Sequence, residues 1–112
     1  MKKLSYFLEE IEGLEILTGP STVEIEHGYV SDLLSDVMRN ARSDSIWVTI
    51  QHHENVVAVA LMADIPVISF ANDITPEQEV IERADEEGIT ICRYPKNSFE
   101  LVGKLYQLGI KG

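Results

Sequence analysis

The sequence contains a single cysteine, Cys92, among 112 residues. One thiol cannot form an internal disulfide, and its place in the apolar run Thr90-Ile91-Cys92 predicts a small buried side chain rather than a nucleophile. The chain also lacks an apolar run of roughly 18 residues, the length of a membrane span, and its first residues do not lead into an apolar signal core. These absences predict a protein of a reducing, cytoplasmic compartment that is neither secreted nor inserted in a membrane.

Basic residues are also scarce. Nine Lys and Arg stand against nineteen Asp and Glu, so the formal net charge is -10. Such a chain repels a phosphate backbone, and its basic residues are spread out instead of forming a stripe, which argues against nucleic acid as a partner.

Two groups of motifs are missing. None of the seven glycines lies in a phosphate-binding loop of the type G-x-G-x-x-G or G-x-x-x-x-G-K-S/T. There is no G-x-S-x-G turn to present a nucleophilic serine. We therefore expect no nucleotide bound in those two ways and no cofactor, and we assign no catalytic residue.

The chain does contain a regular alternation of apolar strands and helices, with Gly and Pro falling singly where elements should end. The expected helices are 3–11, 31–41, 55–63, 75–88 and 97–108, and the expected strands are 14–17, 22–27, 45–50, 66–70 and 89–92. Ser31, Thr75 and Asn97 are suited to cap helices, and Gly88 to end one. Strand 22–27 alternates apolar and charged residues, which is typical of an edge.

Strands separated by helices of about ten residues imply parallel, right-handed crossovers. We therefore predict one domain, residues 1–112, of the α/β class. Its architecture should be a three-layer α/β/α sandwich with a mostly parallel sheet of about five strands, helices on both faces and room for an antiparallel edge strand. Helix 55–63 is apolar on nearly every side, so neighbouring elements or a second subunit should cover it.

Polar residues gather at the junction Gln51-His52-His53-Glu54-Asn55, directly after strand 45–50. In open α/β sheets, ligands bind beyond the carboxyl ends of the strands. The same rule places Thr18-Gly19, His27-Gly28-Tyr29, Asn72-Asp73 and Tyr94 on one rim. Helix N-termini at Ser31-Asp32, Asn55, Thr75 and Asn97 could bind an anion through free backbone N–H groups. The candidate ligand-binding residues are Tyr29, Ser31, Asp32, Gln51, His52, His53, Asn72 and Asp73.

A metal site is the alternative interpretation of the same rim. Imidazoles of His27, His52 and His53, with the carboxylate of Asp73, are suitable ligands for Zn²⁺ or Fe²⁺. Adjacent residues of an extended chain point to opposite faces, however, so His52 and His53 need a turn between them to share one ion.

The segment Gly28-Tyr29-Val30-Ser31-Asp32 is expected to form a strand-to-helix turn. Gly28 would permit the turn, Ser31 would cap the helix, and Asp32 in its first turn would complement the helix dipole. Tyr29 has no such structural explanation.

Several segments together resemble a stand-alone DRTGG domain over nearly the whole chain. They are residues 28–37, 46–53, 55–60 and 105–110. The resemblance implies a fold similar to the N-terminal domain of HPr kinase/phosphorylase, without the catalytic P-loop, which lies in another domain of that enzyme. Many members have Gly-Asp-Arg where this chain has Gln51-His52-His53, and Thr-Gly-Gly where it has residues 70–73.

DRTGG domains occur fused to phosphotransacetylase, CBS or dethiobiotin-synthetase-like domains, and these fusions imply a regulatory or assembly module. We therefore predict a non-catalytic regulatory or ligand-sensing domain that works as a homodimer. It should recognise a small anionic metabolite or a partner protein at the carboxyl ends of its strands. The alternative is a small metal-binding protein or enzyme that uses His27, His52, His53 and Asp73.

Overall fold

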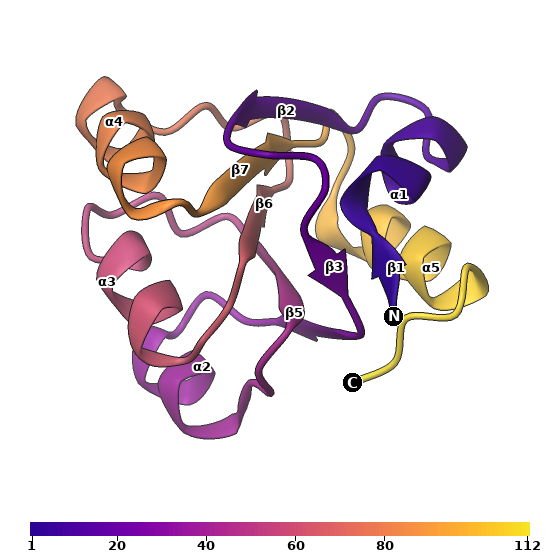
Figure 1. The fold of residues 1–112 in the computed structure, drawn as a ribbon, viewed down its shortest axis with the longest axis horizontal. Coiled ribbons are helices and arrows are strands. Elements are labelled where there is room, and N and C mark those ends of the chain that lie inside the picture. Colours follow the sequence, from indigo (N-terminus) through magenta and orange to yellow (C-terminus); the bar gives the residue numbers. More distant parts are fainter.

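A five-stranded sheet runs through the centre of the molecule in the computed structural model, which describes residues 1–112 (Figure 1). Its strands lie in the order β2 (Glu15–Thr18), β7 (Thr90–Arg93), β6 (Val67–Phe70), β5 (Ser45–Thr49) and β4 (His27–Val30). Strands β7, β6, β5 and β4 are parallel, whereas β2 pairs antiparallel with β7 at one edge. The predicted mostly parallel sheet is therefore confirmed.

Helices cover both faces of this sheet. On one face lie α1 (Leu4–Glu10) and α5 (Ser98–Gln107), and on the other lie α2 (Leu34–Asn40), α3 (Val56–Met62) and α4 (Gln78–Glu87). Figure 1 shows the first pair on the right of the sheet and the other three on the left. The predicted three-layer sandwich is confirmed.

Each face of the sheet has its own apolar core. In β5, Ile46 and Val48 belong to the core under α1 and α5, whereas Trp47 between them belongs to the core under α2, α3 and α4. All five residues of β5 are buried, the polar Ser45 and Thr49 included, as is typical of a central parallel strand with both faces covered. Cys92 is fully buried in the first core, as expected.

The predicted strand 22–27 is wrong in its extent. Two short strands replace it: β3 (Glu24–Ile25) pairs antiparallel with β1 (Lys2–Lys3) outside the main sheet, and β4 then forms the sheet edge. Residues 28–30, expected in a turn, are therefore part of a strand. Pairing with β5 from His27 through Val30 satisfies the backbone groups that face β5, and this long-range pairing outweighs the local turn preference of Gly28.

Two predicted caps are also wrong. Helix α2 begins at Leu34, and the Ser31 hydroxyl instead accepts from the Leu33 N–H in a tight turn at 3.2 Å. Helix α4 begins at Gln78 with Glu77 at its cap position and no side-chain cap, and the Thr75 hydroxyl instead accepts from Arg93. By contrast, Asn97 Oδ1 accepts from the Glu100 N–H at 3.0 Å, and Gly88 ends α4 at φ +75°, both as predicted.

Helix α3 is covered on its inner side by this chain alone. Val56, Val57 and Ala60 are fully buried, and α3 packs against both α2 and α4. Leu61 and Met62 remain exposed at its end. The apolar character of α3 therefore does not require a second subunit, and the homodimer stays a prediction. None of the helices has the length and apolarity needed to cross a membrane.

Candidate functional site

The carboxyl ends of the four parallel strands meet at one rim, which brings together four of the predicted segments. Ser31-Asp32 follows β4, Gln51-His52-His53 follows β5, Asn72-Asp73 follows β6, and Tyr94 follows β7. Two other predicted segments lie at the opposite end of the sheet. His27 starts β4 beside Ser45, and Thr18 ends the antiparallel β2.

The predicted metal cluster is therefore not formed. His27 lies at the amino end of β4, whereas His52 and His53 follow the carboxyl end of β5. No three His, Cys, Asp or Glu side chains in the chain are grouped so that they could hold a metal ion. The sequence pattern predicted a strand that ends at His27, whereas the long-range pairing with β5 makes His27 the first residue of β4.

Asp32 fixes the base of the loop that follows β5. Its Oδ1 accepts from the Thr49 hydroxyl at 2.8 Å and from the Ile50 N–H at 2.9 Å. The expected role of Asp32 in the first turn of α2 is wrong, since that helix starts two residues later. The carboxylate instead joins the end of β4 to the end of β5.

The loop 51–55 folds on itself through three side-chain contacts spaced two residues apart. The Gln51 N–H donates to the Thr49 hydroxyl at 3.0 Å, and the His53 N–H donates to Gln51 Oε1 at 3.1 Å. The Asn55 N–H then donates to His53 Nδ1 at 3.1 Å, a bond that needs an unprotonated Nδ1. Gln51 and His53 thus shape the loop, while His52 and Glu54 are exposed and form no hydrogen bond of their own.

A hollow of about 320 Å³ lies between this loop and the start of α4. It is lined by Gln51, His52, His53, Glu54, Glu77, Glu79 and Val80. Three of these side chains are carboxylates and none is Lys or Arg. The field in this rim hollow therefore favours a cationic group over an anion.

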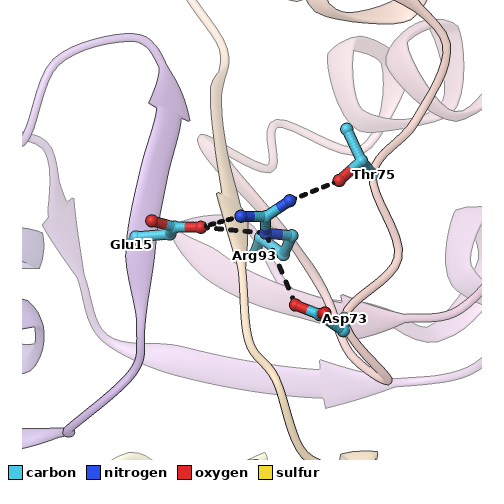
Figure 2. Close-up of polar contacts among 4 residues, drawn as sticks. All are labelled: Glu15, Asp73, Thr75 and Arg93. Carbon is cyan, nitrogen blue, oxygen red and sulfur yellow. Dashed lines mark hydrogen bonds and ion pairs between the residues drawn. The ribbon is translucent and has the colours of Figure 1, made fainter.

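Arg93, at the end of β7, is the most connected charge on the rim (Figure 2). Its guanidinium bonds to Glu15 on the neighbouring β2 and donates to the Thr75 hydroxyl at 2.6 Å. Asp73 lies 3.7 Å away. Sequence reasoning missed Arg93, although a charge at the end of an apolar strand was an available signal. The carboxylates of its partners neutralise the charge of Arg93. The same contacts join β2, β7 and the loop after β6.

Asn72 and Asp73 both adopt left-handed backbone conformations, each with φ +58°. Their N–H groups donate to Lys96 O at 2.8 Å and Tyr94 O at 2.9 Å, so the backbone here is satisfied internally. Such φ values favour glycine, with Asn and Asp the best-tolerated alternatives. This segment is therefore fixed as a tight turn beside Arg93.

Tyr29 has a structural role that the sequence did not reveal. Its side chain packs against the core under α2, and its hydroxyl donates to Asp36 Oδ1 at 2.8 Å. This bond, with burial, raises the pKa of Tyr29. Hydrogen bonds from Ser31, Asn40 and Tyr29 lower the pKa of Asp36. Tyr29 and Ser31 therefore anchor α2 to the edge of the sheet, away from the rim hollow.

No family model matches the sequence, and no curated protein is significantly similar to it. Among solved structures, the chain is similar to the CBS and DRTGG domains from the regulatory region of Clostridium perfringens pyrophosphatase, solved in complex with its activator, diadenosine tetraphosphate. The TM-score is 0.73 at 17% identity, over 94% of this chain and 46% of that one. The chain thus spans about half the length of that regulatory region. The likeness shows a DRTGG-like fold.

Proposed function

We propose that this protein is a regulatory binding module that recognises a partner at the rim hollow and acts by binding rather than by turnover. One observation carries this proposal. The side chains of His52 and Glu54 are exposed and serve no contact within the fold, yet the loop that holds them is fixed by Asp32 and by its own hydrogen bonds. Exposed polar groups on a preformed loop are typical of recognition sites.

The charge of the hollow favours a partner protein over a small anionic metabolite. Glu54, Glu77 and Glu79 line it, and the nearby Arg93 is already paired with Glu15. An anion would meet repulsion here without a free cation to offset it. A partner that presents Lys or Arg side chains would complement the carboxylates, and such complementarity contributes mainly specificity and association rate.

The structural neighbour supports a regulatory role, since it belongs to the regulatory region of a pyrophosphatase. Its activator carries several phosphates, so diadenosine tetraphosphate is the natural rival ligand for the present chain.

A homodimer remains part of the proposal. Light scattering at high protein concentration tests it, and a strictly monomeric species would remove the dimer.

The binding test uses amide NMR spectra of the ¹⁵N-labelled protein, titrated separately with pentalysine and with diadenosine tetraphosphate. We expect pentalysine to shift the amides of residues 51–54, because their side chains line the hollow. Replacing Glu54 by Gln should weaken this binding roughly two- to fivefold, the range that an exposed ion pair supports. Glu86→Gln is the matched control, since it removes the same charge from an exposed position of α4 outside the hollow.

Two results would contradict the proposal. One is a set of pentalysine shifts that spreads over the whole acidic surface and is weakened equally by Glu54→Gln and Glu86→Gln. The other is a set of shifts at residues 51–54 with diadenosine tetraphosphate alone, which would show that the rim takes an anion.

A further inference from the structure

A second concave surface lies on the other face of the sheet from the rim hollow. This groove, of about 340 Å³, runs between the edge strand β4 and helix α5 and is bordered at one end by the C-terminal residues 110–112. In Figure 1 the chain leaves α5 and turns back towards the sheet, where it ends. The groove plays no part in the function proposed for the rim.

The groove has a buried apolar floor and exposed apolar walls. Val48, Leu105 and Ile110 form the floor and are at most 6% exposed. Val30 on β4 and Tyr106 on α5 stand on either side at 50% and 56% exposure. A concave apolar surface of this volume is within the range of small-molecule sites, which combine apolar walls with a few placed polar groups.

One charged side chain lines the groove, and it is a cation. Lys111 Nζ lies 3.4 Å from the centroid of the Tyr106 ring, and no carboxylate lies within 4 Å of it. No Asp or Glu is among the lining residues, although nineteen of the 112 residues are acidic. Lys111 is therefore the one charged side chain among the lining residues.

The backbone of β4 adds a hydrogen-bond donor at the edge of the groove. The Gly28 N–H points outward and donates to Lys111 O at 2.9 Å, whereas the Ser31 N–H points inward and donates to Val48 O at 3.3 Å. Because N–H directions alternate along a strand, the Val30 N–H also points outward, away from β5. The groove therefore combines apolar walls with an ammonium and an N–H at its rim.

We propose that this groove binds a small apolar carboxylic acid, with its hydrocarbon part against Val30, Val48 and Leu105 and its carboxylate at Lys111. Removal of apolar area from water supplies most of the affinity. The ammonium selects the anionic head. A highly charged ligand such as a nucleotide has too little apolar surface for these walls and would find one cation for its several charges.

The test is an amide NMR titration with decanoate and, separately, with its neutral counterpart decanol, both below their aggregation limits. Decanoate should shift the amides of Gly28, Val30 and Tyr106. Lys111→Gln should weaken decanoate binding roughly two- to fivefold and leave decanol binding unchanged. Lys96→Gln, which removes the same charge from an exposed loop outside the groove, should change neither.

Three outcomes would overturn the proposal. Decanoate could leave the groove amides unmoved, or it could bind equally well to the Lys111→Gln protein. The same amides could also shift with protein concentration in the absence of any additive, which would show that a second copy of the chain occupies the groove. None of these outcomes depends on pentalysine binding at residues 51–54, so the two sites are tested separately.

Discussion

Replacing Asp32 by Ala should destabilise the protein by about 2 kcal/mol, because one carboxylate oxygen joins two strand ends. It accepts from the Thr49 hydroxyl at 2.8 Å and from the Ile50 N–H at 2.9 Å. Hydrogen bonds to a charged group contribute about 1.5–3 kcal/mol each when well shielded. Asp32 itself is exposed, which reduces that contribution, but the Thr49 side chain is fully buried and would lose its acceptor.

Urea unfolding followed by tryptophan fluorescence measures this change directly. Trp47 is the one tryptophan of the chain and is fully buried, so its emission should report the loss of tertiary structure. For a domain of this size, about 2 kcal/mol corresponds to a fall in Tm of roughly 8 °C. Asp32→Asn keeps an acceptor oxygen without the charge and should lose less than about 1 kcal/mol.

A double-mutant cycle isolates the contact itself. Asp32→Ala and Thr49→Val should be non-additive by at least about 0.5 kcal/mol, because both remove the same hydrogen bond. A stability of Asp32→Ala within about 0.5 kcal/mol of the parent protein, the range of an ordinary surface substitution, would contradict the structural role of this carboxylate. Equal stabilities of the Asn and Ala variants would contradict it as well.

Three further predictions concern other parts of the fold. Burial raises the pKa of the Cys92 thiol to about 12. A thiol reagent at pH 8 should therefore modify the protein only when urea is added. Rapid modification of the native protein would contradict this prediction. Gly19→Ala should lower the free energy of unfolding, measured with urea, more than Gly88→Ala does. Both positions have positive φ, but a Cβ on Gly19 would lie 2.6 Å from Thr90 Cα, whereas a Cβ on Gly88 would meet open space. Equal losses would show that the contact with Thr90 does not matter. The lowered pKa of Asp36 stabilises the fold at pH values above the pKa of this group in the unfolded chain, and this stability is lost as the pH falls through the lower folded pKa. Asp36→Asn should therefore make the free energy of unfolding fall less steeply at acid pH. An unchanged fall at acid pH would contradict the role assigned to Asp36.

The sequence predicted part of the site correctly and part wrongly, for identifiable reasons. Gln51, His52 and His53 lie at the carboxyl end of a central strand, as expected, because the apolar residues 46–48 followed by a polar segment indicate that end locally. Asp32 was predicted to be a site residue that complements a helix dipole, and that structural role is wrong. Its partners Thr49 and Ile50 are distant in sequence, and no local pattern indicates which strand end they meet.

Arg93 illustrates the same limit. Its partner Glu15 is 78 residues away, and the two meet because β2 runs antiparallel beside β7. The direction of β2 also removes Thr18 from the rim, whereas His27 leaves the rim because β4 begins at this residue instead of ending there. Both errors have a long-range cause, since pairing between distant segments decides where a strand begins and in which direction it runs.

The sequence by itself determined the kind of most elements, the burial of Cys92 and the α/β class. These follow from apolar periodicity and from residues such as Gly88 and Asn97, which act on their own neighbours. Only the tertiary structure decided which charges are paired, which strands are edges and where concave surfaces form. Those properties arise from contacts between distant segments, and for this reason the acidic rim hollow and the apolar groove beside Lys111 became visible only in the folded chain.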